Sequence, residues 1–402
     1  MGEALSKQEL MNKLIEESAA ITPTVNSSEE QKGFIMSNSV YMSENYQTVI
    51  DSKTISSANF GATPIDAKKN AIEIYVERLA VKVTATVDNT QSNYKNLGTE
   101  EAPEHAFKVV DAPDVDGQGT DIYAKLLAWD INTTAEKSFL VKHLNDVWNA
   151  SNPYQGWNDY NKSRSYFAES TSQTDYNSEF QWTGINNKFN EADYCLENTS
   201  NADYTKVLVK AQLGTLSGNI FTPQTIYQWY SVYYTSLDAL REAVKTAVSE
   251  QISLDKSNIS TTSLYDADDP DSYEAFQLKL GVANGTYNKP NTQTALTTDE
   301  IAAIFDALPT VKVWSTGATY YFTKIQHNDN PKINAVIRNH AYRVSIEGVK
   351  GLGTPVYIPE GSEGEEPTIP EPVLPEDTET YIAAKINVLS WKIVSNNVIL
   401  GQ

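Results

Sequence analysis

Alternating apolar and polar positions predict β-strands along most of the chain. In residues 71–87 apolar side chains recur mostly at every second position, and the parity changes between Val76 and Leu79, where a bulge would re-register the two faces. Short strands separated by turns such as GLGTP at 351–355 are typical of β-sandwich domains. Further strand patterns occur at residues 122–134, 205–213, 311–315, 318–325 and 340–349.

Helical periodicity is confined to a small part of the second half. Ser236 is a suitable N-cap for a helix whose apolar face carries Leu237, Leu240, Val244 and Val248. A shorter helix is predicted from Thr298, with acidic residues in its first turn. We interpret the two helices as an insertion in a β-domain.

The chain of 402 residues is long enough for two domains, and a polar stretch near residue 200 suggests the boundary. The predicted fold is mainly β, with two tandem β-sandwich domains, a small helical insertion in the second and an extended C-terminal strand tail. The predicted units are a flexible N-terminal arm (1–32), the two sandwiches (33–200 and 201–360), an acidic proline-rich linker (361–380) and a C-terminal donor-strand tail (381–402).

The last segment of the chain points to assembly. Proline with Glu and Asp in residues 361–380 favours an extended, solvated backbone, and a β-rich sequence follows it. A strand on such a tether can pair with a sheet edge in the same molecule or in another one. The sequence therefore suggests assembly rather than catalysis.

Charge and cysteine content exclude several classes of protein. A net charge of −21 and a pI of about 4.6 argue against nucleic acid or an anionic membrane as a partner. The single Cys195 cannot form an intramolecular disulfide, and we interpret it as a small buried hydrophobe rather than a nucleophile. The first residues are too polar for a signal peptide, so the chain is either cytoplasmic or a mature form.

The sequence contains no P-loop, dinucleotide fingerprint, HExxH or G-x-S-x-G motif, and we predict neither an enzyme nor a cofactor. The four histidines are scattered, which favours structural roles. Asp111, Asp114 and Asp116 are weak calcium candidates in a loop without EF-hand spacing, and a similar acidic loop follows residue 265. For both loops we favour a solvated turn and predict no metal site.

Aromatic side chains are concentrated in a polar loop between residues 148 and 167. Trp148, Tyr154, Trp157 and Tyr160 form a candidate adhesion surface for a carbohydrate or a protein. The alternative, which we favour, is that they anchor a long loop on the sandwich.

Several segments together resemble the Bacteroidia fimbrillins, the type V pilins, and in particular their minor-fimbrium branch. Each segment is only a strand or turn pattern, but they occur in the order of that family and cover most of residues 33–402. The segments are GFIMSNS, IEIYVERLAVKV, WNDYNKSRSYFAES, YCLENT, VIRNHAYRVSIEGVKGLGTPV and INVLSWKIVSNNVIL.

The resemblance implies transthyretin-like sandwiches and a subunit exported as a lipoprotein precursor and attached to the outer membrane within a fimbrium. An arginine-specific protease then removes an N-terminal strand, and the C-terminal strand of another copy fills the groove. The implied partners are other copies of the chain, accessory fimbrial subunits and a host or bacterial surface ligand. No arginine precedes Arg78, so we expect an already processed form.

In the tail, Trp391 and Ile393 lie on one face of the predicted donor strand, and Val394, Val398 and Leu400 lie on the other. We expect the latter three to fill the groove. Two alternatives stay open. The chain is a fimbrial tip or accessory adhesin that does not form the shaft, or a secreted glycan-binding protein or hydrolase, which lacks catalytic signatures and ranks below the others.

Overall fold

The structure, a computed structural model, describes most of two packed β-sheets and the elements around them. The described residues are 6–17, 24–25, 32–38, 41–42, 49–50, 56–59, 76–111, 120–143, 176–177, 182–200, 202–263, 277–327, 334–356, 382–389 and 392–398.

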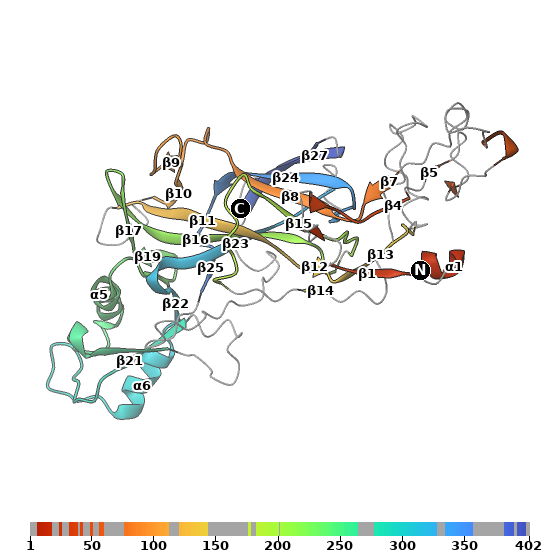
Figure 1. Ribbon diagram of the computed structural model, residues 1–402. Coiled ribbons are helices and arrows are strands. Elements are labelled where there is room, and N and C mark those ends of the chain that lie inside the picture. The colour runs from red at the N-terminus through yellow and green to blue at the C-terminus, as the bar shows by residue number, and fades with distance from the viewer. Residues whose placement is uncertain are drawn as a thin grey trace.

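Two sheets pack face to face in a β-sandwich (Figure 1). The larger sheet has the strand order β25-β23-β16-β11-β10-β9, with β17 paired to β16, and the smaller has the order β15-β8-β24-β26-β27. The strands of the larger sheet are β9 (Tyr94–Asn96), β10 (His105–Val110), β11 (Ile122–Asn132), β16 (Lys206–Ser217), β17 (Ile220–Pro223), β23 (Ala318–Lys324) and β25 (Thr354–Pro355). Those of the smaller sheet are β8 (Val81–Val87), β15 (Ala192–Cys195), β24 (His340–Val349), β26 (Ile382–Leu389) and β27 (Lys392–Val398).

The inner faces of the two sheets share one apolar core, as the alternating patterns predict. Val81, Val83 and Ala85 of β8 are fully buried, and they belong to the same cluster as Val207 and Val209 of β16. Burial of alternate side chains from both sheets is the main stabilising contribution to this architecture. The mainly β fold class is confirmed.

A smaller module with its own apolar core lies at one end of the sandwich (Figure 1). Its sheet has the order β19-β18-β22-β21-β20, and the helices α5 and α6 pack against it. Ser236 caps α5, and Leu240, Val244 and Val248 are buried, which confirms that predicted helix. The elements are β18 (Ile226–Trp229), β19 (Val232–Tyr234), α5 (Leu237–Val248), β20 (Ile259–Ser263), β21 (Gln277–Val282), α6 (Thr298–Asp306) and β22 (Val311–Trp314).

Short elements of the first part of the chain lie toward the opposite end (Figure 1). β1 pairs with β13, β4 with β7, and β12 with β14, each as a two-stranded sheet. The elements are α1 (Lys7–Met11), β1 (Leu14–Glu16), β2 (Thr24–Val25), β3 (Lys32–Gly33), β4 (Met36–Asn38), β5 (Tyr41–Met42), β6 (Val49–Ile50), β7 (Val76–Arg78), β12 (Thr134–Ala135), β13 (Lys137–Phe139) and β14 (Tyr176–Asn177).

Two details of the chain path bear on the sequence-based expectations. β7 ends at Arg78 and β8 begins at Val81, so the change of face occurs between two strands rather than in a bulge within one. Strands on the two sides of residue 200 are neighbours in both sheets, since β16 pairs with β11 and β24 pairs with β8. The division into two tandem domains stays a prediction.

Candidate assembly site

β24 is the strand on which the C-terminal part of the chain is built. Tyr342, Val344 and Ile346 are buried in the core, whereas Arg343 on the other face is exposed. One edge of β24 pairs in parallel with β8 along Ala341–Ile346. This anchors β24 firmly and leaves its second edge available to another strand.

The second edge of β24 is covered by the C-terminal tail of the same chain. β26 pairs with it antiparallel, from Ala341 opposite Leu389 to Val349 opposite Ile382, with a register shift between Ile346 and Gly348. β27 pairs antiparallel with β26 and also pairs in parallel with the start of β24, His340 opposite Lys392. The tail thus completes the sheet through backbone hydrogen bonds, the interaction that β-augmentation uses between molecules.

The predicted donor-strand residues fall partly in this hairpin. Ile393, Val394 and Val398 belong to β27. Trp391 and Leu400 lie outside the described residues. Which of the five side chains enters a groove stays a prediction.

The chain enters β24 through a tight turn at Asn339. Its φ of 58° lies in the left-handed region, which Asn tolerates better than most residues. The Asn339 backbone N–H donates to the carbonyl of Ala80 at 3.0 Å. The Asn339 side-chain oxygen accepts from the Arg78 guanidinium at 3.3 Å. These contacts tie the start of β24 to the segment that joins β7 and β8.

A buried guanidinium lies directly before this turn. Arg338 is fully buried and donates through Nε to Glu197 Oε1 at 2.8 Å and through Nη2 to Ser138 Oγ at 2.9 Å. It also donates to the carbonyls of Phe139 at 2.6 Å and Leu140 at 3.1 Å. One side chain therefore connects β24 with β13 and with the segment that follows β15.

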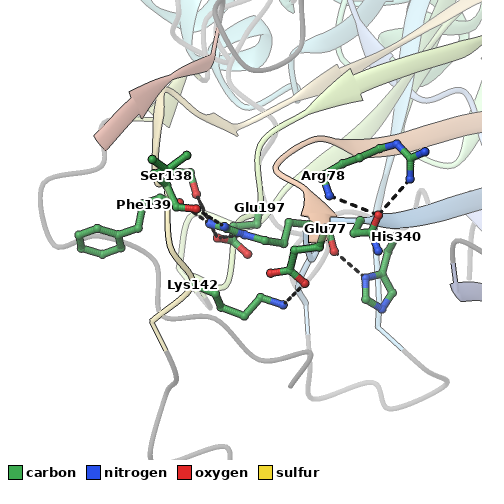
Figure 2. A network of polar contacts seen from close by, with 10 residues as sticks. Glu77, Arg78, Ser138, Phe139, Lys142, Glu197 and His340 are labelled. Atoms are coloured by element: carbon green, nitrogen blue, oxygen red, sulfur yellow. Dashed lines mark hydrogen bonds and ion pairs between the residues drawn. The ribbon is translucent and has the colours of Figure 1, made fainter. Parts of the chain in front are cut away.

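A second buried ion pair lies in the same network (Figure 2). Lys142 Nζ and Glu77 Oε2 are 3.0 Å apart, and their side chains are 1% and 2% exposed. Burial alone would raise the pKa of Glu197, but the charge and hydrogen bonds of Arg338 hold that pKa below its ordinary value. Glu197 is therefore a carboxylate whose charge depends on Arg338.

The N-terminal strand β1 docks beside this network. It pairs antiparallel with β13, with Leu14 opposite Phe139 and Glu16 opposite Lys137. Ile15 packs against a small apolar cluster of Leu79, Ala135 and Leu196. β13 is thus held by β1 through backbone pairing and by Arg338 through its terminal carbonyls.

Carboxyl groups gather where the N-terminal segment meets the two sheets. Burial raises the pKa of Glu17 to about 7, and the charges of Asp193 and Glu136 act in the same direction. Burial and the neighbouring Asp193 also raise the pKa of Asp130 to about 7. The Asn187 amide donates to Asp193 at 3.0 Å and to Asp130 at 3.4 Å. At neutral pH this region carries unfavourable negative charge.

The other predicted ligand sites lie largely outside the described residues. Trp148, Tyr154, Trp157 and Tyr160 do so, as do Asp114 and Asp116. Asp111 is 64% exposed and forms an ion pair with Lys108 at 2.5 Å. Within the described ranges, no group of three or more His, Cys, Asp or Glu side chains is arranged to hold a metal ion.

Cys195 is fully buried in the main core, and burial raises the pKa of its thiol well above the ordinary value. The interpretation of Cys195 as a small buried hydrophobe is confirmed. His340 is also buried, and its Nδ1 lies 2.8 Å from the carbonyl oxygen of Arg338. This confirms the structural role expected for that histidine.

The sequence patterns did not identify the buried network. Arg338 and Glu197 are separated by 141 residues, so no local spacing links them. The only local signal is an arginine directly after the apolar pair Val336 and Ile337, which are both fully buried. An arginine in such a position needs a buried acceptor, but the tertiary fold decides which residue is that acceptor.

A family model covers β24 and the tail strands that pair with it. Residues 312–397 match the C-terminal domain of fimbrillin, the major fimbrial subunit protein type IV. The match extends from β22 into β27 and supports a structural subunit of a cell-surface fimbrium. No curated protein matches the chain. In the described part of the chain, no helix is long and apolar enough to cross a membrane.

Proposed function

We propose that the chain is a structural subunit of a fimbrium, close to the minor-fimbrium branch, and that it polymerises by β-strand exchange through its C-terminal tail and supports adhesion. The observation that carries the proposal is the place of β26 and β27, which complete the sheet at the free edge of β24. The fimbrillin match over the same residues supports it.

Exchange of this kind needs a strand that can leave one copy and pair with another. β26 is joined to β25 through 26 residues that include the acidic linker, so release of the tail would leave β24 and the core in place. Backbone hydrogen bonds would supply affinity in the new pairing, and alternate side chains would set its register.

Under this proposal, the subunit is exported as a lipoprotein precursor and is attached to the outer membrane within the fimbrium. Its partners are other copies, accessory subunits and a surface ligand. The net charge of −21 keeps separate copies apart in solution. Polymerisation would therefore depend on a specific strand contact rather than on general association.

Two truncations separate the roles of the tail strands. A chain ending at Ser390 loses β27 and keeps β26, whereas a chain ending at Thr380 loses both. Surface material from cells that make each form is examined by electron microscopy and on boiled and unboiled SDS gels. We expect filaments and heat-sensitive ladders from the full chain only.

Each other outcome has a definite meaning. Filaments from the Ser390 form but not from the Thr380 form would assign the donor strand to β26. Filaments from both would contradict donation by the tail. If the full chain is folded and exported but forms no filament, the shaft role is wrong and a tip or accessory adhesin takes its place.

Substitutions in β27 test the predicted face. Val394→Asp or Val398→Asp introduces a charge at a proposed groove-filling position, and we expect the ladders to disappear. Ile393→Asp is the matched control on the other predicted face and should leave them largely intact. Equal loss in all three would show that the face assignment is wrong.

A further inference from the structure

The ladder between β24 and β26 contains one irregular point. The regular antiparallel pairs end with Ile346 opposite Ala384, and they resume with Gly348 opposite Ala383. Between these two pairs β24 has one additional residue, Glu347, for which β26 has no counterpart. Such an insertion is a β-bulge, in which two residues of one strand oppose one residue of the other.

The bulge keeps both halves of β24 on the apolar core. Before the bulge, every second residue is buried, namely Tyr342, Val344 and Ile346. After it, Val349 is buried in the same cluster, although it follows Ile346 by three residues. Strict alternation would turn Val349 to the opposite face of the sheet. The bulge is therefore a feature of β24 that a strand at its second edge has to match.

The bulge also lies where β24 loses its other neighbour. The parallel pairing with β8 ends with Ile346 opposite Val87, and the Asp88 N–H donates to the carbonyl of Ile346 at 2.8 Å. In the described part of the chain, β26 is the strand that pairs with β24 beyond this point. The strand at the second edge must therefore accommodate the additional residue.

The tail strand has a distinctive residue at the matching place. Alternate residues of β26 stand opposite buried residues of β24, and three of these four tail residues are β-branched. The small residue among them, Ala384, is the one paired next to the bulge. The four pairs are Ile382 with Val349, Ala384 with Ile346, Ile386 with Val344 and Val388 with Tyr342.

Alternation alone does not fix this register. A slip of the tail by one residue would place Lys385 opposite Ile346, which is excluded because that face of β24 is buried. A slip by two residues would place Ile386 there and would keep the apolar residues on the same face. The two-residue slip differs from the observed register chiefly at the bulge, where the twist is increased and two residues oppose one.

We propose that the bulge at Glu347 determines the register at the second edge of β24, and that this edge accepts an alternating apolar strand with a small residue opposite Ile346. In this chain Ala384 is that small residue. The register itself does not depend on the fimbrial role. The identity of the partner rests on the proposed strand exchange, under which the matching strand is the tail of a second copy.

Disulfide trapping in the full chain measures the register. In a Cys195→Ala background, Arg343→Cys is combined in turn with Lys385→Cys, Asn387→Cys or Leu389→Cys. Arg343 lies opposite Asn387, and the other two positions are two residues to either side, so all three pairs would occupy the same kind of place in the ladder. Since a disulfide needs closely spaced Cα atoms, we expect the Asn387→Cys disulfide to form several-fold more readily than the other two.

Exchanging two residues of the tail moves the small residue without changing β24. Ale384 is not needed at its own position if the tail can slip, so Ala384→Ile/Ile386→Ala should shift the register by two residues. The strongest disulfide should then move from Asn387→Cys to Leu389→Cys. Ile386→Val/Val388→Ile is the matched control, because it exchanges two tail residues away from the bulge and should leave the disulfide at Asn387→Cys.

The outcomes separate this inference from the proposed function. An exchanged tail that still cross-links at Asn387→Cys would overturn the register proposal. Loss of all three disulfides would overturn it too, because the exchanged tail should still pair after the slip. On non-reducing gels of surface material, a disulfide within one chain leaves a monomer band, whereas a disulfide between copies gives a ladder that survives boiling. A register that follows the small residue within single chains only would support the bulge and contradict strand exchange.

Discussion

At one end of the sandwich, β24 begins beside a buried guanidinium that contacts two distant segments of the chain. At the other end, α5 and α6 cover a small sheet through an apolar cluster that includes Leu240 and Phe305. The polar end depends on directional contacts, each of which is costly to leave unmade. The apolar end depends on buried contact area, so the stability lost on substitution increases with the side-chain volume that is removed. The comparison suggests that the polar end fixes one arrangement of β13 and β24, on which the tail strand is built.

The largest expected effect is at Arg338. Arg338→Met removes the guanidinium and leaves the buried Glu197 without its cation, which should cost about 3–5 kcal/mol in the free energy of unfolding. Arg343→Met is the matched control, because Arg343 lies in β24, five residues further along the chain, and is exposed. Urea unfolding of both variants measures the difference.

The double variant Arg338→Met/Glu197→Leu sharpens that test. It removes both charges together, and we expect it to recover a large part of the stability lost in Arg338→Met. If Arg343→Met destabilised as much as Arg338→Met, the network would have no special role at this end.

A somewhat smaller effect is expected at the apolar end. Leu240 is fully buried on α5, and Leu240→Ala should cost about 3 kcal/mol through lost burial and the cavity that remains. Leu237→Ala on the same helix should cost less, because Leu237 is only partly buried. Hydrogen exchange should show faster opening of α5 and β18 while β24 stays protected. Equal exchange increases in β24 would mean that the two ends do not behave as separate regions.

The sequence predicted these two ends unequally well. The α5 face and its Ser236 cap are local patterns, and both are present in the structure. β24 and the turn after it were also predicted, since alternation and glycine are local signals, and Gly351 and Gly353 have φ values of 69° and 72°.

The sequence did not predict which strands pair with each other. β24 lies between β8 and β26, strands that are far from each other in the sequence, and alternation cannot specify such neighbours. The buried contacts of Arg338 were missed for the same physical reason, because they exist only after distant segments meet. The tail was predicted as a strand, but its place on its own β24 was left open by the sequence.

The smallest expected effect is a pH dependence of the polar end. The pKa values of Glu17 and Asp130 are raised to about 7 in the folded chain, chiefly by burial, whereas in the unfolded chain both groups ionise near pH 4. Their raised pKa values make folding most favourable below the unfolded values, and this contribution is lost as the pH rises through about 7. The thermal midpoint should therefore be higher at about pH 5 than at about pH 7.5, by a few degrees.

Self-repulsion of a chain with net charge −21 acts in the same direction, so the comparison needs a control of equal charge. Asp130→Asn removes one of the two raised pKa values and should flatten the pH dependence of the thermal midpoint. Glu101→Gln removes one negative charge at an exposed position and should leave the slope nearly unchanged. If both variants flattened it equally, general repulsion rather than the carboxyl group at Asp130 would set the response. A flatter slope in Asp130→Asn alone would place the pH sensitivity where the N-terminal segment meets the two sheets, since Glu17 and Asp130 both lie near Asp193.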